Sequence, residues 1–362
     1  MNGLCDLSAA RRFDLSPWIS ADDGPGAVVA VLSGGEVQSW ISRGRAEVGA
    51  EAPRLTPQTA FYAASVAKQF TAACVTQCEA AGALDVDASV RAYIPELPAL
   101  FQPVTLRHLL HHLGGLRRGW DLVAAQGWAA NWWEGRGLWD LIAVLAQEPE
   151  LLTPPGQTHL YSNAGYWLLA ACVERASGEP FAAFARQTLF EPLGMHASRF
   201  RDDPDAHQPG LVLGHALLDG QYQPVQTRFH GVGDGGLLTT VEDLASWDLF
   251  WSGRSRLGSE LPPRLEERGR RNDGAWLYYA RGVSLRSHRA VPIISHGGSF
   301  LGYLSKLVRF PEQNFSIACL ANAGDIDVDG LSMALADLVL GDQADQQAPS
   351  WAQSVRDDGL AL

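Results

Sequence analysis

The β-strand signals of this chain lie near its two ends, and a long helical stretch separates them. Residues 27–48 are predicted as two strands joined at Ser33–Gly35, because β-branched residues alternate on both sides of a glycine pair. Strand character returns in four later segments, 276–287, 291–296, 303–310 and 315–321. We expect both ends to build one antiparallel sheet flanked by helices, an α/β arrangement of the α+β type.

The stretch from about 85 to 250 consists of helical segments punctuated by Gly and Pro. Apolar spacing and capping residues predict helices at 105–113, 138–147, 164–177, 180–190 and 240–251. Two further helices are predicted at 65–81 and 328–340, beside the strand segments. The middle of the chain is therefore expected to form an inserted all-helical lobe.

These elements predict one two-lobed domain over residues 1–340. The sheet lobe takes about 25–84 and 252–340, and the helical lobe takes about 85–251. The remaining residues, 341–362, are polar and interrupted by proline, so they are expected to form a flexible C-terminal tail. The sequence gives no prediction of the oligomeric state.

Charge and hydropathy exclude two classes of partner. The formal net charge is −12, and an acidic surface repels phosphate backbones, so no nucleic-acid partner is expected. No stretch approaches the roughly 20 apolar residues of a membrane span. The first twenty residues lack the apolar core of a secretory signal, which predicts a cytoplasmic protein, or a periplasmic or secreted one if a leader has been removed.

The cysteines indicate neither a disulfide framework nor a metal site. There are five, an odd number without paired spacing. Cys74 and Cys78 lie one helical turn apart and could form half of a metal site, but no nearby His or Cys supplies further ligands. We interpret them as small buried apolar residues and predict no metal and no cofactor.

Lysine is almost absent. Lys and Arg together number 28, yet the only lysines are Lys68 and Lys306. Arginine stays protonated at any accessible pH, whereas a buried lysine can lose its proton and act as a base. A lysine that persists in such a chain indicates a position where arginine cannot function, which directs attention to Lys68.

Ser65 and Lys68 are spaced for a catalytic pair. Residues three apart share one face of a helix, so the serine at the start of the predicted helix can hydrogen-bond to Lys68. A serine hydroxyl is a weak nucleophile until a neighbouring base takes its proton. The unpaired N–H groups at the helix start favour developing negative charge. This motif alone is a weak signal, and the scarcity of lysine strengthens it.

Two further motifs could complete such a site. Tyr161 and Asn163 precede a predicted helix; a cation favours the phenolate form of a nearby tyrosine, and the amide could orient Lys68 and a substrate. His296, Gly297, Gly298 and Ser299 follow a predicted strand, where two glycines allow close approach of substrate. The Ser299 and Ser65 N–H groups could then form an oxyanion hole. Taken singly, a buried tyrosine, a helix-capping asparagine and a lone histidine are more often structural.

The three motifs, in this order, resemble those of the serine β-lactamase and penicillin-binding-protein superfamily, which are S-x-x-K, then S-D-N or Y-x-N, then K-T-G. The tyrosine in the second motif resembles the class C β-lactamase branch, with its D-alanyl-D-alanine carboxypeptidases, D-aminopeptidases and carboxylesterases. Further segments similar to that branch are 108–116, 190–195, 235–237 and 309–312. The resemblance covers about residues 25 to 340 and implies the β-lactamase/DD-peptidase-like fold.

The resemblance also implies roles for individual residues. Ser65 would be the acylated nucleophile, Lys68 its activating partner and Tyr161 the general base. Asn163 would contact Lys68 and substrate, and the N–H groups of Ser65 and Ser299 would form the oxyanion hole. Whether Lys68 or Tyr161 takes the first proton stays open.

The third motif departs from that of the β-lactamases, because His296 stands where they have lysine. A histidine is mostly neutral at pH 7, so binding of a penicillin carboxylate is weakened. We therefore expect a small-molecule ester, amide or peptide substrate, with a carboxylesterase or D-specific amidase favoured. A true β-lactamase or D-alanyl-D-alanine carboxypeptidase is the alternative, and a non-catalytic ligand-binding or structural member of the fold is a second one.

Two other features carry no firm assignment. Glu148 and Glu150 are similar to a deacylating loop of class A β-lactamases but precede the second motif, so we interpret them as solvated carboxylates. Residues 117–139 contain five tryptophans, which either cover the cleft with apolar surface or pack within the helical lobe.

Overall fold

The computed structural model describes residues 5–20, 22–128, 135–206 and 210–341. The predicted tail at 341–362 therefore lies outside the described residues except for its first residue. None of the described helices is both long and apolar enough to cross a membrane.

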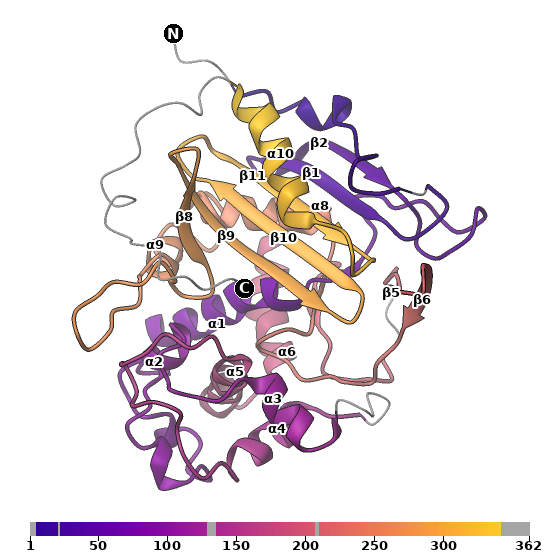
Figure 1. The fold of residues 1–362 in the computed structure, drawn as a ribbon. Helices are drawn as coiled ribbons and strands as arrows, with labels where there is room; N and C mark the ends of the chain where they lie inside the picture. The colour runs from indigo at the N-terminus through magenta and orange to yellow at the C-terminus, as the bar shows by residue number, and fades with distance from the viewer. Residues whose placement is uncertain (1–4, 21, 129–134, 207–209, 342–362) are drawn as a thin grey trace.

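Both ends of the chain contribute to one antiparallel sheet, as predicted (Figure 1). In the described chain its order is β2-β1-β11-β10-β9-β8. The N-terminal strands are β1 (Ala27–Ser33) and β2 (Glu36–Arg43). The C-terminal strands are β8 (Ser284–His288), β9 (Val291–Phe300), β10 (Tyr303–Phe310) and β11 (Phe315–Ala321). β1 pairs with β11 over Ala27↔Ala321 to Leu32↔Ser316, and this pairing joins the two ends of the chain.

Helices cover both faces of this sheet, which explains why β1 is apolar at every position from Ala27 to Leu32. Successive side chains of β1 point to opposite faces, so Val28 enters one hydrophobic core and Val29 the other. On one face lies α10 (Val328–Leu340), and on the other lies α8 (Val241–Trp251) (Figure 1). α8 contacts β1, β2 and β11, so it packs with the sheet although the sequence division placed it at the end of the helical lobe.

The helical segments pack around α1 (Ala67–Ala80) and α5 (Asn163–Ser177), which contact each other. The other described helices are α2 (Leu106–Leu110), α3 (Gly119–Ala125), α4 (Leu138–Leu145), α6 (Phe181–Ala185), α7 (Glu191–Leu193) and α9 (Leu261–Leu265). The shorter helical turns are η1 (Ala9–Arg12), η2 (Ala64–Val66), η3 (Val90–Ala92), η4 (Ala99–Phe101) and η6 (Arg186–Phe190). α5 contacts α2, α3, α4 and α6, while α1 contacts α6 and α9.

Short strands also occur within and beside the helical segments, which the sequence pattern did not indicate. β3 (Phe61–Tyr62), β7 (Leu237–Thr239) and β4 (Arg199–Phe200) form a small sheet in the order β3-β7-β4. β5 (Gly214–Leu218) and β6 (Gln221–Val225) form a hairpin. The small sheet positions the chain immediately before α1, because β3 leads into that helix.

Two strand predictions need correction. The predicted strand 276–287 is regular only from Ser284, and residues 276–283 form an irregular loop. Gly282 has φ +78° in this loop, which is incompatible with a β-strand for most residues. The strand predicted at 291–296 continues to Phe300, so the whole His296–Ser299 motif lies within β9.

Arg281 anchors the irregular loop to α1. Its side chain is 2% exposed and contacts Glu79 of α1 at 2.5 Å, together with Glu267. Glu79 also pairs with Arg264 at 2.9 Å. A buried charge is tolerated only when it is paired, so this network fixes both the loop and the helix.

Replacing Arg281 with alanine removes a buried guanidinium and leaves Glu79, whose side chain is 16% exposed, without its partner in the loop. We expect the free energy of unfolding to fall by about 3 kcal/mol or more, measured by urea denaturation. Arg186→Ala is the matched control, because Arg186 and its partner Glu191 are 53% and 52% exposed. That control should cost less than about 1 kcal/mol. An equally small loss in both variants would contradict a stabilising role for Arg281.

Candidate active site

Ser65 lies in a sharp turn between a strand and a helix. β3 ends at Tyr62, the N–H of Ala63 donates to the carbonyl of Leu237 at 2.8 Å, and η2 then leads into α1. Ala64 adopts φ +46°, a left-handed conformation that is costly for a residue with a side chain. Ser65 is half-buried while both of its neighbours are buried. The turn thus presents this hydroxyl at the start of the helix.

Lys68 has no exposed surface, and its ammonium nitrogen contacts three oxygens. Nζ lies 3.0 Å from Ser65 Oγ, 2.8 Å from Asn163 Oδ1 and 2.8 Å from the carbonyl oxygen of Asp234. The oxygens of Asn163 and Asp234 can only accept hydrogen bonds. A neutral amine can therefore donate to both and keep its lone pair for the Ser65 hydroxyl, whereas an ammonium donates to all three. The geometry serves both protonation states of Lys68.

The second lysine of the chain is not in this site. Lys306, on β10, pairs with Asp329 at 2.5 Å. This contact agrees with the sequence argument, which assigned no chemistry to Lys306.

Asp234 was not predicted and contributes a buried carboxylate beside Lys68. It is 4% exposed, and Trp167 Nε1 donates to its Oδ1 at 2.6 Å. Burial raises the pKa of Asp234, while Lys68 opposes that rise by favouring the carboxylate. Its neighbours Gly233 and Gly236 have φ +106° and +81°. The sequence signal that could have indicated Asp234 is its position as a single acid among glycines. No periodic pattern in the neighbouring residues indicates it.

Tyr161 lies beside Lys68, as the motif predicted. Lys68 Nζ is 4.9 Å from the centre of the Tyr161 ring. Asn163 follows as the first residue of α5, so one short segment brings both residues to the lysine. The packing of α1 against α5 holds that segment in place.

His112 positions the Tyr161 segment and belongs to the segment 108–116 that resembles the family. Its Nδ1 accepts the N–H of Ser162 at 3.2 Å, and its ring centre lies 4.3 Å from that of Tyr161. Burial is the main cause that lowers the pKa of His112 well below 6.5, and His159 adds to it. The imidazole is therefore neutral and able to accept this bond.

The third motif lies against Ser65 through Gly298. A Cβ at Gly298 would lie 2.5 Å from the carbonyl oxygen of Ala63 and 2.9 Å from the backbone nitrogen of Ser65. Only glycine fits there, so β9 passes directly over the turn that carries Ser65. Gly297 pairs with Lys306 and Ser299 with Leu304 across β10, and Ser299 is exposed.

His296 completes the group as a neutral, largely buried ring. It is 8% exposed, and its ring centre lies 6.3 Å from that of Tyr161. Burial is the main cause that lowers the pKa of His296 to about 3, and the charge of Lys68 adds to it. The structure therefore brings Ser65, Lys68, Tyr161, Asn163 and the His296–Ser299 strand together. Tyr279, in the irregular loop 276–283, also contacts His296. The sequence analysis did not predict this residue, because it belongs to none of the motifs.

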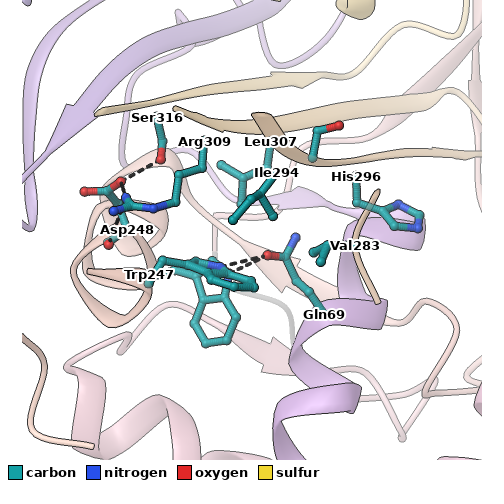
Figure 2. A pocket seen from close by; sticks show the side chains of 11 residues that line it. Gln69, Trp247, Asp248, Val283, Ile294, His296, Leu307, Arg309 and Ser316 are labelled. Carbon is teal, nitrogen blue, oxygen red and sulfur yellow. Dashed lines mark hydrogen bonds and ion pairs between the residues drawn. The ribbon is translucent and has the colours of Figure 1, made fainter. Parts of the chain in front are cut away.

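A small cavity lies behind this group, between α1, α8 and the sheet (Figure 2). His296 lies at one end of it and the buried pair of Asp248 and Arg309 at the other. Gln69 accepts hydrogen bonds from Trp247 at 2.6 Å and from Trp251 at 3.3 Å. These contacts fix the residue that follows Lys68 on α1.

The described residues contain no candidate metal site, because no three of their His, Cys, Asp or Glu side chains are grouped closely enough to hold an ion. Cys74 and Cys78 are buried on α1, and burial raises the pKa of Cys78 to about 11. Such thiols are protonated and suit the apolar interpretation.

Two remaining sequence features can now be placed. Glu148 is not freely solvated, because its side chain is 15% exposed and pairs with Arg117 at 3.3 Å. Trp120 stacks on Phe300, with ring centres 5.4 Å apart, at the end of β9. Trp132 and Trp133 lie outside the described residues.

The chain is similar to known proteins of one family. A family model described as beta-lactamase matches residues 16–342. Penicillin-binding protein 4* of Bacillus subtilis is 30% identical over 320 residues, covering 81% of this chain and 67% of that protein. A D-aminopeptidase of Gluconobacter oxydans is 26% identical over 301 residues, covering 83% of this chain and 56% of that protein. The chain thus spans little more than half the length of that D-aminopeptidase.

One solved structure shows how far the fold is shared. The octameric penicillin-binding protein homologue from Pyrococcus abyssi has a TM-score of 0.80 and 24% identity, covering 92% of this chain and 78% of that one. The predicted family and fold are confirmed by these matches. The chain belongs to the beta-lactamase family, a family of serine hydrolases.

Proposed function

We propose that this chain hydrolyses small esters or amides through an acyl-enzyme at Ser65. The observation that carries this proposal is the 3.0 Å contact between Lys68 Nζ and Ser65 Oγ, with Lys68 fully buried and its other two contacts made by oxygens that can only accept. Such a nitrogen can take the serine proton without moving. The resemblance to the family supplies the same roles for these residues.

The proposed reaction has two steps. In the first, Ser65 Oγ attacks the substrate carbonyl carbon while its proton passes to Lys68 or Tyr161, and the N–H groups of Ser65 and Ser299 receive the negative charge on the carbonyl oxygen. The proton then moves to the leaving alcohol or amine as the carbonyl–heteroatom bond breaks. In the second, Tyr161 takes a proton from a water molecule, whose oxygen attacks the acyl carbon. The proton then passes to Ser65 Oγ as the acyl–oxygen bond breaks, which releases the acid and restores the serine hydroxyl.

The state of His296 argues for substrates without a carboxylate near the third motif. Its ring is neutral because its pKa is lowered to about 3, so it supplies no fixed cation. We therefore favour a carboxylesterase or a D-specific amidase or peptidase, and the relative named D-aminopeptidase supports the second. The relative named penicillin-binding protein keeps a β-lactamase or D-alanyl-D-alanine carboxypeptidase as the alternative. A non-catalytic member of the fold would have no need of the buried, bonded Lys68.

Ser65→Ala tests the nucleophile. The variant should lose labelling by a fluorophosphonate or penicillin probe, and p-nitrophenyl butyrate hydrolysis should fall about 1000-fold or more. Ser177→Ala, at the far end of α5, is the control and should keep full labelling. Undiminished labelling of Ser65→Ala would remove Ser65 from the mechanism, and silence of the folded wild type on nitrocefin and all esters would favour the non-catalytic alternative.

Lys68→Arg tests whether Lys68 exchanges a proton. Arginine keeps the charge but cannot act as a base, so ester hydrolysis should fall at least about 100-fold. Lys68→Met gives the reference for complete loss of the amine, and thermal unfolding checks that both variants fold. If Lys68→Arg retains most of the activity, Lys68 acts as a fixed charge and Tyr161 takes the proton.

His296→Lys tests the specificity argument. A lysine ammonium adds the cation that a substrate carboxylate needs, so the kcat/KM ratio of nitrocefin to p-nitrophenyl butyrate should rise about tenfold. His296→Gln, which is uncharged, should leave the ratio near that of the wild type. Equal changes in both variants would show that charge at this position does not select the substrate.

A further inference from the structure

Tyr279 reaches the candidate site from the irregular loop 276–283 and contacts His296. Its hydroxyl oxygen lies 3.1 Å from His296 Nε2, and its side chain is 3% exposed. Burial is the main cause that holds the pKa of Tyr279 well above 10, so the phenol keeps its proton at working pH. Tyr279 therefore enters the site as a neutral hydroxyl.

The second nitrogen of His296 determines the direction of this hydrogen bond. Nδ1 lies 2.6 Å from the carbonyl oxygen of Gly297. A carbonyl oxygen can only accept, so Nδ1 carries a proton. In a neutral imidazole Nε2 then has the lone pair, and the Tyr279 hydroxyl, which also contacts the Tyr166 hydroxyl, is the group placed to donate to it. Both ring nitrogens are thus occupied by groups of the protein itself.

We propose that Tyr279 is a positioning and specificity-determining residue, which holds His296 as the uncharged Nδ1–H tautomer and thereby disfavours substrates with a carboxylate at the third motif. The tautomer follows from the two hydrogen bonds alone. The consequence for substrate choice rests on the proposed function. A hydroxyl that donates to Nε2 must lose that hydrogen bond before the nitrogen can take a proton.

The charged groups that face His296 also favour its neutral form. Lys68 and Lys306 both disfavour a second positive charge at the ring. The other neighbours are aromatic rings: those of Tyr161 and Tyr279 lie 6.3 and 5.9 Å from that of His296 between centres, and that of His112 lies 4.7 Å from that of Tyr279. Among these contacts, the one from Tyr279 reaches Nε2 directly.

The loop that carries Tyr279 is built against the catalytic helix. A Cβ at Gly282 would lie 2.6 Å from the carbonyl oxygen of Lys68, so the loop backbone rests directly on α1. Ala280 closes the turn by donating to the carbonyl of Val283 at 2.8 Å, and the buried Arg281 binds Glu79. The position of the Tyr279 hydroxyl is thus tied to the helix that carries Lys68.

Tyr279→Phe removes only the hydroxyl, and the state of the ring can be read directly. Long-range ¹H–¹⁵N spectra of the histidines, with the His296 signals identified by their loss in His296→Gln, distinguish the tautomers. In the wild type we expect one Nδ1–H tautomer that stays neutral from pH 8 to pH 5. In Tyr279→Phe the neutral form loses a donor, so the ring should titrate at a higher pH than in the wild type.

Tyr278→Phe is the matched control, because it removes the neighbouring hydroxyl while the Tyr278 ring stacks on Arg286, 4.1 Å from the guanidinium carbon. It should leave the His296 signals unchanged. A wild-type ring in the Nε2–H form would overturn the proposal, and so would a Tyr279→Phe ring with the titration of the wild type. These readouts need no turnover, so they decide the tautomer even if the hydrolase assignment fails.

The effect on specificity is measured with benzylpenicillin and its methyl ester as inhibitors of p-nitrophenyl butyrate hydrolysis. For the wild type and Tyr278→Phe, the ratio of the two inhibition constants should be the same at pH 5 and pH 8. In Tyr279→Phe the free acid should gain about threefold over the ester at pH 5, because an imidazolium binds a carboxylate. A ratio that stays independent of pH in Tyr279→Phe, with an altered tautomer, would overturn the specificity role.

Discussion

A buried lysine nitrogen bound by three oxygens is the contact on which this site depends. An unpaired amine at a position with no exposed surface would cost several kcal/mol, so the fold must supply partners for every proton of Lys68. The oxygens come from separate segments: the turn at Ser65, the start of α5 at Asn163, and the glycine-rich turn at Asp234. The three segments can meet only when the sheet and the helical segments are both assembled.

Close approach of backbone, rather than of long side chains, allows this convergence. Gly298 brings β9 onto the turn of Ser65, and Gly282 brings the loop of Tyr279 onto Lys68, where a Cβ would lie 2.6 Å from the carbonyl oxygen. Gly233 approaches the carbonyl oxygen of Tyr166 on α5 in the same way. Each glycine removes a Cβ where two chain segments touch, so the beginnings of α1 and α5 are surrounded by main chain. That leaves little freedom for Lys68 to move away from Ser65.

The sequence predicted those parts of the site that depend on local spacing. Ser65 and Lys68 lie three residues apart where α1 begins, and Tyr161 and Asn163 lie where α5 begins, so both pairs could be recognised without coordinates. Asp234 and Tyr279 could not be recognised in this way. Asp234 contacts Lys68 through its carbonyl oxygen, and the two residues are 166 positions apart in the chain. Tyr279 lies in a loop without regular structure, so no periodic pattern indicates where its side chain lies. Residues 276–283 show the limit: their aromatic and β-branched residues are typical of a strand, but the positive φ of Gly282 prevents one.

The imidazoles near Lys68 all have the same charge state. His112, His159 and His296 all have lowered pKa values, chiefly through burial, with His159 at about 4 and His296 at about 3. Between pH 5 and pH 8 these rings stay neutral, so the charge around Ser65 does not change through them. A proton exchanged near Ser65 in this range is therefore not taken up by any of these three rings. Neutral rings therefore add no charge of their own to the surroundings of Ser65 and Lys68.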